Sequence, residues 1–413
     1  MSRAVRAKRS WFGRVVVMLV ALVVVAGCSG GGPILANPPL DFESPPPPSA
    51  LPSHPADPIP VVLPRDDGPH QRLTEWWYYT GHLKTAEGRR FGFEAVVFRA
   101  ERSSVPVAWA SHLALTDEQG DAFHYAQRSE VGRQVDASPR DAAGTPTGFD
   151  LGILGLNPAL VAAGAPPAAD TPWHLAGAGG TDRIEAALTP EEAAAAGASF
   201  GLSLDLRALK PPALHDGEGF VDFGPAGSSY YYSRTQLAAE GSLTLDGETL
   251  AVDGTAWFDH QWGDFVSVGG GGWDWFAINL DNGTDITVSI VLDRQQNQLI
   301  GYGTLVAPNG AVSHLDRGAV NAFCTSPWTS PATGYYWATS CSLSVIKPDG
   351  TQLAIELRPT VQAQELDTRA TTGVVYWEGS QIVEAQASDA DGFSIPGGPL
   401  GGEAYVERTR YSP

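Results

Sequence analysis

The chain has 413 residues, a formal net charge of −20, and 47 glycines and 32 prolines. This length is too great for one small domain and predicts two compact units. The acidic charge argues against nucleic acid as a partner, because nucleic-acid-binding proteins carry a basic face, and the abundance of glycine and proline favours short strands and turns over long helices.

The N-terminal residues have the features of an export signal. A basic stretch from Arg3 to Arg14 precedes an apolar run over 15–26, which is short for a membrane-spanning helix. The run ends in Val-Ala-Gly-Cys, a pattern typical of a bacterial lipobox, in which Cys28 becomes lipidated. We therefore expect a signal peptide over 1–27 and an exported protein of the cell envelope, anchored by Cys28 to the periplasmic or extracellular face of a membrane. An ordinary secretory signal that happens to contain Cys28 is the alternative.

Residues 28–64 have the composition of a tether. They hold four consecutive prolines at 45–48 and further prolines up to Pro64, with few apolar residues. Such a segment is extended and solvated. It predicts a spacer between the lipid anchor and the first folded domain.

From about residue 70 the pattern changes to short strand-like runs. Asp-Gly and Asn-Gly turns at 246–247, 282–283, 309–310 and 349–350 separate several of them, and only the alanine-rich segment 189–198 has helical composition. The pattern predicts an all-β protein of antiparallel strands, either barrels or sandwiches. A glycine run at 269–272 suggests a seam, so we expect domains over 65–265 and 266–413.

Familiar catalytic and metal-binding motifs contribute little. Residues 197–201 match Gly-x-Ser-x-Gly, but a nucleophile elbow needs a strand before the serine and a helix after it, and here the order is reversed. No pair of histidines has metal-ligand spacing on one element. We therefore expect neither a metal nor a cofactor. Cys324 and Cys341 form an even pair, which in an exported protein favours a disulfide over two buried thiols.

The segment 254–263, Gly-Thr-Ala-Trp-Phe-Asp-His-Gln-Trp-Gly, is unusually aromatic. A strand here would place alternate residues on opposite faces: Phe258, His260 and Trp262 on one, and Trp257, Asp259 and Gln261 on the other. Both faces are largely aromatic, which predicts burial on both sides. By itself this favours a packed strand, in which Asp259 and His260 are satisfied core groups. The alternative is that one face lines a cavity.

Two nearby strands place acids on apolar faces. Asp274 shares a face with Phe276 and Ile278, and Glu94 shares a face with Phe98. Burial favours the neutral form of a carboxyl group, and a neutral acid in an aromatic pocket is a proton donor. Alternatively, Asp274 pairs with a buried arginine, for which Arg99 and Arg234 are candidates, and is structural.

Several segments resemble the carotenoid 1,2-hydratase (hydroxyneurosporene synthase) and AttH-like family. They are "EWWYYTGHL" (75–83), "YYYSRT" (230–235), "GTAWFDHQWG" (254–263), "GGWDWFAINLDNG" (271–283), "YWEG" (376–379) and "GEAYVE" (402–407). The resemblance extends from residue 75 to the C-terminus. It implies an all-β fold of two lipocalin-like antiparallel β-barrels in tandem.

The resemblance also implies an activity. The carotenoid enzymes add water to a terminal C=C bond of an acyclic carotenoid without a cofactor. On this basis Asp274 would be the acid, and His260 would position water or accept its proton. The residues expected to contact a lipophilic ligand are Trp257, Trp262, Trp273, Trp275, Tyr78 and Glu94. Aromatic faces there could stabilise a carbocation.

The export signal and the proline-rich tether depart from the carotenoid enzymes. AttH-like members are associated with ABC export systems. The sequence therefore supports a second hypothesis, in which a membrane-tethered, lipocalin-like protein holds a lipophilic molecule, and an ABC transporter is a partner. Asp274 and His260 would then only hold the two barrels together.

Overall fold

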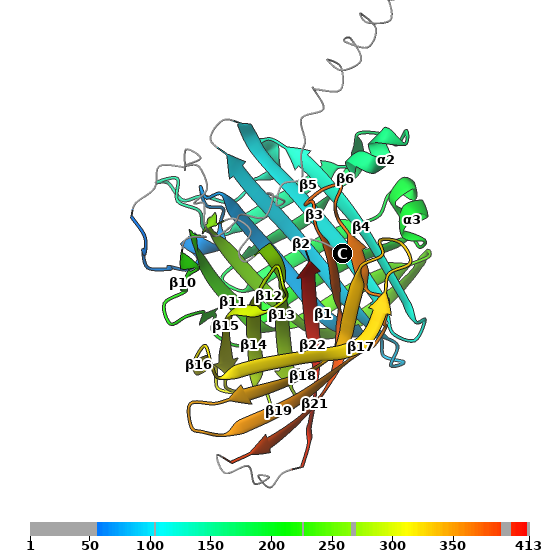
Figure 1. Cartoon of the computed structure of the whole chain (residues 1–413). Coiled ribbons are helices and arrows are strands. Elements are labelled where there is room, and N and C mark those ends of the chain that lie inside the picture. The colour runs from blue at the N-terminus through cyan, green and yellow to red at the C-terminus, as the bar shows by residue number, and fades with distance from the viewer. Residues whose placement is uncertain (1–55, 103–104, 225–226, 266–269, 390–397, 411–413) are drawn as a thin grey trace, which may run out of the picture.

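The computed structural model describes residues 56–102, 105–224, 227–265, 270–389 and 398–410 (Figure 1). The expected signal peptide, the lipidation site Cys28 and residues 29–55 of the expected tether lie outside these residues. No helix within the described ranges is long and apolar enough to cross a membrane. The helices found there are η1 (Arg65–Asp67), η2 (Arg133–Val135), α2 (Pro158–Ala162) and α3 (Pro190–Ala196).

The N-terminal half forms a nearly closed antiparallel barrel, the first barrel. Its strands are β1 (Thr74–Lys84), β2 (Arg90–Arg102), β3 (Val105–Asp117), β4 (Ala122–Val131), β5 (Phe149–Gly155), β6 (Ala168–Ala178), β7 (Thr181–Ala187), β8 (Phe200–Ala208), β9 (Ala213–Leu214), β10 (Phe220–Asp222), β11 (Gly227–Leu245) and β12 (Glu248–Phe265). Their order is β4-β3-β2-β1-β12-β11-β8-β7-β6-β5, with β9 and β10 paired to β11. The edges meet where Arg128 bridges Leu156, and where Glu130 accepts a 2.8 Å bond from the backbone N–H of Leu154.

The C-terminal half forms a second antiparallel sheet, a half-barrel that we call the second barrel. Its strands are β13 (Gly270–Leu280), β14 (Asp285–Asp293), β15 (Gln298–Val306), β16 (Val312–Leu315), β17 (Val320–Thr329), β18 (Tyr336–Ile346), β19 (Gln352–Pro359), β20 (Glu365–Asp367), β21 (Val375–Ser388) and β22 (Leu400–Arg410). Their order is β16-β15-β14-β13-β22-β21-β19-β18-β17, with β20 on β21. The chain passes from one sheet to the other between Phe265 and Gly270, beside the predicted glycine seam.

Side-chain alternation fills both interiors. On β12, Phe258 and Trp262 point into the core of the first barrel, while Trp257 faces the second barrel. On β13, Phe276 and Ile278 enter the core of the second barrel. The predicted phases of these two strands are therefore confirmed. Because bulky side chains occupy each interior, the remaining faces of the central strands pack against one another between the barrels.

Local features of the chain follow the sequence. The alanine-rich segment forms α3, and Thr189 caps it by accepting a bond from the backbone N–H of Glu192. Ser199 comes after this helix and before β8, the reverse of a nucleophile elbow. Cys324 on β17 and Cys341 on β18 are direct cross-strand neighbours and are joined by a disulfide.

Buried polar contacts fasten the two barrels together. Lys210, which follows β8, lies 2.7 Å from the carboxylate of Asp285 at the start of β14. Thr235 on β11 donates to the same carboxylate at 2.6 Å. His215 bridges Ser233 of the first barrel and Thr304 of the second at 2.7 and 2.8 Å. Such contacts are directional, so they set the orientation of one barrel on the other.

Candidate functional site

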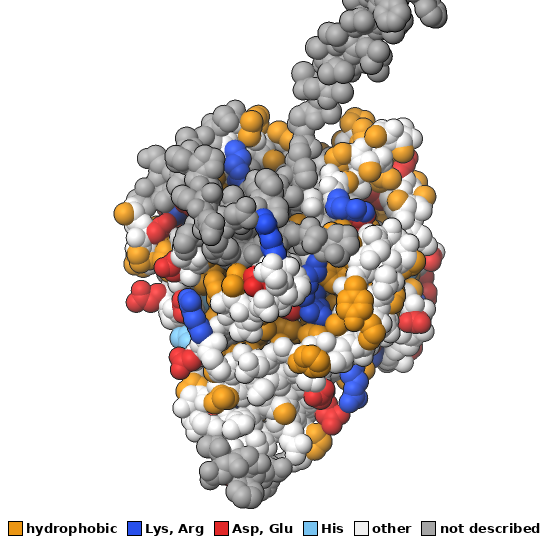
Figure 2. All heavy atoms as spheres, viewed as in Figure 1, with side chains coloured by type: hydrophobic (Ala, Val, Ile, Leu, Met, Phe, Trp, Pro, Cys, Tyr) orange, Lys and Arg blue, Asp and Glu red, His pale blue; other side chains and the backbone are white. Residues whose placement is uncertain are grey.

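A cavity of about 160 Å³ lies between the two barrels, bounded by outward-facing side chains of both. Strands β1, β2 and β12 form one wall, and β13, β21 and β22 form much of the other. Its aromatic lining consists of Trp76, Tyr78, Phe98, Phe223, Tyr231, Phe265, Trp273, Trp275, Tyr302 and Tyr376. Figure 2 shows hydrophobic and basic side chains gathered in the middle of one face, between the broader upper and narrower lower parts of the molecule.

The aromatic wall is built from positions that alternate with core positions. On β1, Tyr78 faces the cavity while its neighbours Trp77 and Tyr79 enter the first barrel. On β13, Trp275 faces the cavity from the second barrel, and its ring meets that of Tyr78 edge-on at 5.3 Å. The indole N–H of Trp275 also donates to the hydroxyl of Tyr231 at 3.1 Å. The wall is therefore fixed by contacts across the interface of the barrels.

Two carboxyl groups face the cavity from opposite barrels. Glu94 lies on β2 and Glu378 on β21, and each is only 1% exposed. The hydroxyl of Tyr376 donates to Oε1 of Glu94 at 3.1 Å, and the hydroxyl of Tyr78 donates to Oε1 of Glu378. The second oxygen, Oε2, of each glutamate has no partner among the described residues.

Burial sets the protonation of this glutamate pair. It raises the pKa of Glu94 to about 8, against the hydrogen bond from Tyr376 and with help from the charge of Glu407. Burial also raises the pKa of Glu378 well above its usual value, with added repulsion from Glu94 and Glu407. In the part of the chain that the structure describes, neither forms an ion pair with a lysine or arginine. Glu94 is therefore mostly a neutral acid at pH 7, and burial shifts Glu378 toward its neutral form as well.

A buried histidine continues the network behind Glu94. The hydroxyl of Tyr376 lies 2.5 Å from Nδ1 of His112, and Nε2 of His112 lies 3.1 Å from Oγ1 of Thr371. Burial lowers the pKa of His112 to about 3, so the ring is neutral. The neutral ring can donate from Nδ1 to the hydroxyl oxygen of Tyr376, and that hydroxyl donates in turn to Oε1 of Glu94. This chain of bonds orients the acid and crosses from the first barrel to the second.

Two further carboxyl groups line the cavity and titrate closer to neutrality. Burial raises the pKa of Asp259 to about 6, although Ser233, Tyr231 and Trp257 donate hydrogen bonds to it. Burial raises the pKa of Glu407 to about 7, and Oε1 of Glu407 accepts a 2.7 Å bond from Thr409. At pH 7 Asp259 is therefore mostly ionised and Glu407 is about half ionised, so both can accept a proton while Glu94 can donate one.

Asp274 lies on the other face of β13 and does not line the cavity. Arg408 donates to its two oxygens at 3.0 and 3.1 Å, and Nη1 of Arg410 lies 2.8 Å from Oδ1. Burial opposes the charged form, but the two guanidinium groups outweigh it and lower the pKa of Asp274. The expectation of a neutral acid at Asp274 is therefore wrong. The alternative of buried arginine partners holds, but with Arg408 and Arg410 in place of Arg99 and Arg234.

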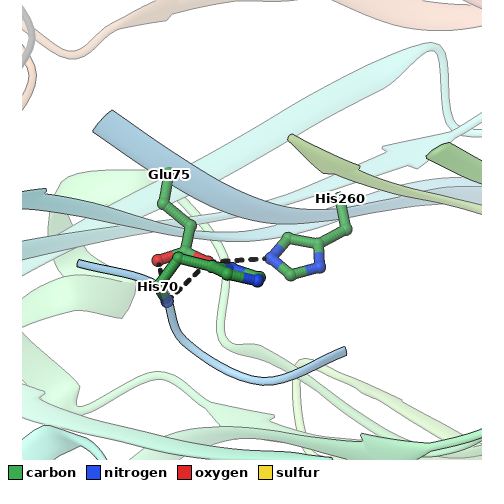
Figure 3. Close-up of side chains that lie close together, drawn as sticks. All are labelled: His70, Glu75 and His260. Carbon is green, nitrogen blue, oxygen red and sulfur yellow. Dashed lines mark hydrogen bonds and ion pairs between the residues drawn. The ribbon is translucent and has the colours of Figure 1, made fainter. Parts of the chain in front are cut away.

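His260 also lies away from the cavity, in the interior of the first barrel. Its Nε2 is 3.0 Å from Oε1 of Glu75, and the same oxygen lies 2.7 Å from Nδ1 of His70 (Figure 3). Trp262 shares this side of β12 and stacks on the ring of His70 at 4.1 Å. The structure therefore separates His260, predicted to position water or accept its proton, and Trp262, predicted to contact the ligand, from the cavity that holds the other predicted residues.

The cavity does unite most of the remaining predicted residues. Tyr78, Glu94, Trp273 and Trp275 all line it. Trp257 lies behind the wall, where its indole N–H donates to Oδ1 of Asp259 at 2.7 Å. These residues come from both barrels, so neither barrel holds the cavity alone.

The sequence reasoning missed His112, Tyr376, Glu378 and Glu407, and it did not choose Asp259 as a cavity acid. A signal existed for Glu378, which lies in Tyr-Trp-Glu-Gly between aromatic neighbours, as Glu94 lies in Phe-Glu-Ala. The same alternation argument applies to both. No comparable signal marks His112, because its partners Tyr376 and Thr371 are more than 250 residues away.

Comparison with known families settles the lineage. The AttH-like family profile matches residues 54–411. The chain belongs to the AttH-like family. This assignment confirms the resemblance seen in the sequence motifs and covers both barrels together with the loops between them.

Solved structures share the fold of this AttH-like protein. An AttH protein from Nitrosomonas europaea is 26% identical, with a TM-score of 0.66 over 86% of this chain and 98% of its own. Kievitone hydratase from Nectria haematococca is 14% identical, with a TM-score of 0.57 over 88% and 95%. CghA is 13% identical, with a TM-score of 0.50 over 92% and 97%. No significant match was found among curated proteins. The two last structures are similar in fold alone, the tandem lipocalin-like architecture.

Proposed function

We propose that the protein is a hydratase that binds a lipophilic, unsaturated molecule between its barrels and adds water to a C=C bond. The observation that carries this proposal is the glutamate pair, Glu94 and Glu378, buried opposite each other in an aromatic cavity with one oxygen of each free. Protonating an alkene needs an acid that is neutral at working pH, and burial supplies one. The hydratase named among the structures of shared fold is consistent with this chemistry.

The cavity residues suggest a sequence of steps. Glu94 gives its proton to one alkene carbon, which leaves a carbocation on the other. The faces of Trp273 and Trp275 stabilise that charge by cation–π attraction, which is strongest in a desolvated site. Water then forms the new C–O bond, and Glu407 accepts the proton that the water loses. Tyr376 and His112 hold Glu94 in position throughout.

The shape of the cavity limits the substrate. Pockets that enclose a drug-sized ligand measure roughly 300–1,000 Å³, and this cavity offers about 160 Å³. A long polyene would therefore place only its reacting end between the barrels. An acyclic carotenoid or another isoprenoid with a branched terminal alkene fits this description, and it is the substrate class that we propose.

Hydration is tested with the full-length protein purified from its host membranes. Native mass spectrometry identifies the lipophilic molecule that it carries, and that molecule is then incubated with the protein in H₂¹⁸O. The expected product is heavier by one labelled water. Glu94→Gln should lower the rate by about 10²–10⁴-fold while the ligand stays bound. The matched control is Glu384→Gln, at an exposed position of the same strand as Glu378, which should keep the full rate.

The same experiment separates the hydratase from a lipid-binding protein. A retained ligand that gains no labelled water would favour the second hypothesis, a tethered binding protein that hands its cargo to an ABC transporter. A rate unchanged by Glu94→Gln would overturn the assignment of the acid.

We also propose that the protein is exported and lipid-anchored through Cys28. The basic segment, the apolar run and the Val-Ala-Gly-Cys sequence support this. Metabolic labelling with a fatty acid should mark the wild-type protein and not the Cys28→Ala variant. Labelling of both proteins would place the lipid elsewhere.

A further inference from the structure

We infer that His70, Glu75 and His260 form a binding site for a divalent transition metal of the zinc kind, at one end of the first barrel and apart from the cavity. The three residues come from separate segments: His70 precedes β1, Glu75 lies on β1 and His260 on β12. One ligand atom from each lies within 4.8 Å of the others (Figure 3). The strand pairing places these segments together, although their sequence spacing hides the cluster.

The donor set suits zinc. Two imidazoles and a carboxylate are typical of zinc sites in which three protein ligands leave a further position for water. Oε1 of Glu75 lies 2.7 Å from Nδ1 of His70 and 3.0 Å from Nε2 of His260. Ligands at about 2.0–2.1 Å around a tetrahedral ion lie about 3.3 Å apart, so a small outward shift would admit the ion. Arg99 approaches the other oxygen, Oε2, at 3.8 Å, and the backbone N–H of His70 donates to Oε1 and Oε2 at 3.2 and 3.0 Å.

The surroundings of the histidines fit ligation. Metal-binding histidines usually donate their second N–H to a carboxylate, and Nε2 of His70 lies 3.3 Å from Oδ1 of Asp66. Asp66 is itself held by Arg65 and by the backbone N–H of Val62. Nδ1 of the fully buried His260 has no partner among the described residues. With a metal ion on Nε2, the ring proton would reside on Nδ1, and the lone pair of Nε2 would point at the cluster.

Space for a fourth ligand lies beside the cluster. A hollow of about 130 Å³ is lined by Asp66, His70 and Trp262, among others. The stacked rings of Trp262 on His70, and of Trp77 on His260, form an apolar shell around the ligands. Such a shell limits solvent access and strengthens the attraction between a cation and the buried carboxylate. A bound ion would also attach the segment before β1 to the barrel.

The test uses the full-length, untagged protein in detergent, stripped of metal by a chelator. Zn²⁺ titrated calorimetrically should bind at one equivalent and raise the Tm, and Co²⁺ should give the visible absorption of a tetrahedral site. His70→Ala, at a partly exposed position, should abolish binding. Asp66→Asn should weaken it about 10–100-fold. The control is His174→Ala, since His174 pairs with Asp150 at 2.6 Å outside the cluster, and its binding should equal that of the wild type.

Two results would overturn the inference: no saturable Zn²⁺ binding by the wild type, or binding that survives His70→Ala. If His70→Ala does not fold, X-ray absorption of the Zn²⁺-loaded wild type decides the question. Two imidazole nitrogens and a carboxylate oxygen support the site, and any other ligand set rejects it. Because hydration in the cavity needs none of these residues, either outcome leaves the proposed function to its own experiment.

Discussion

Two buried acids, Glu94 in the cavity between the barrels and Asp274 on the opposite face of β13, differ in charge. Glu94 meets aromatic rings and a tyrosine hydroxyl, and burial raises its pKa to about 8. Asp274 meets two guanidinium groups, which lower its pKa despite burial. The first is a proton donor at pH 7, and the second is one end of a buried ion pair.

The ion pair at Asp274 should be important for stability. Asp274→Asn leaves Arg408 and Arg410 without their counter-charge, and breaking a buried pair in this way costs about 3–5 kcal/mol. Denaturant unfolding at pH 7 measures this loss. The surface variant Asp253→Asn, whose partner Lys84 is 3.8 Å away, should change little.

The sign of the pH dependence follows from the lowered pKa of Asp274. The ionised carboxylate of Asp274 adds to the free energy of unfolding above the unfolded-state pKa of about 3.9. This stabilisation is lost as the pH falls through the lower folded-state pKa. The difference between wild type and Asp274→Asn should therefore shrink below about pH 4. Equal stability of the two proteins at pH 7 would contradict the ion pair.

The pH dependence of stability that arises from Glu94 should have the opposite sign. The folded-state pKa of Glu94, about 8, exceeds the unfolded value of about 4.3. The stability that it confers is complete below about pH 4 and is lost as the pH rises through about 8. Glu94→Gln should thus gain stability relative to wild type between pH 5 and pH 9, on the order of 4 kcal/mol. Unfolding midpoints across that range measure it, and a flat difference would show that Glu94 is ionised in the folded protein.

At the level of elements, β17 and β18 are joined covalently. The disulfide joins Cys324 and Cys341, which are 17 residues apart in the sequence. For a loop of this length the chain-entropy model gives a stabilisation of about 3 kcal/mol. Reduction, or the Cys324→Ser variant, should lower the Tm of the protein in calorimetry. A reductant should have no further effect on the variant. A wild-type Tm that is insensitive to the reductant would show that the bond is not formed.

Strand phase was the most predictable property of the elements. Alternation in β12 and β13 correctly separated core from non-core faces, because a period of two follows from strand geometry alone. It could not identify the partners. Asp274 is ionised because β22 brings Arg408 beside it, and no local pattern contains that pairing. Trp275 lines the cavity and Trp262 lies in a barrel core, but their sequence surroundings are similar. The difference depends on which strands pack against them, and a local pattern does not contain that information.

At the level of the molecule, the barrel interface should unfold as part of one structure. Lys210→Met removes the cation beside the buried Asp285 and should cost about 3 kcal/mol or more. Calorimetry should show the transition of the wild type broadening or splitting as the barrels uncouple. Lys84→Met, in an exposed pair, is the control, and an unchanged transition in Lys210→Met would show that other contacts hold the barrels.

The family motifs predicted the tandem barrels, but not that the cavity would lie between them. In a sequence, an aromatic strand that lines the inside of a barrel and one that lines its outside have the same appearance. Only the packing of β1 and β12 against β13 and β22 distinguishes them. The metal-binding cluster was hidden likewise, because Glu75 and His260 are 185 residues apart.

Because the cavity lies on the outer faces of the strands, selection for ligand binding and selection for folding act on alternate residues of the same strand. In β1, Trp77 and Tyr79 belong to the barrel core, whereas Trp76 and Tyr78 face the cavity. Descendants of this protein could therefore acquire a new ligand preference through every second residue while the intervening ones stay under constraint from folding. Ligand preference and foldability can then diverge independently within one gene.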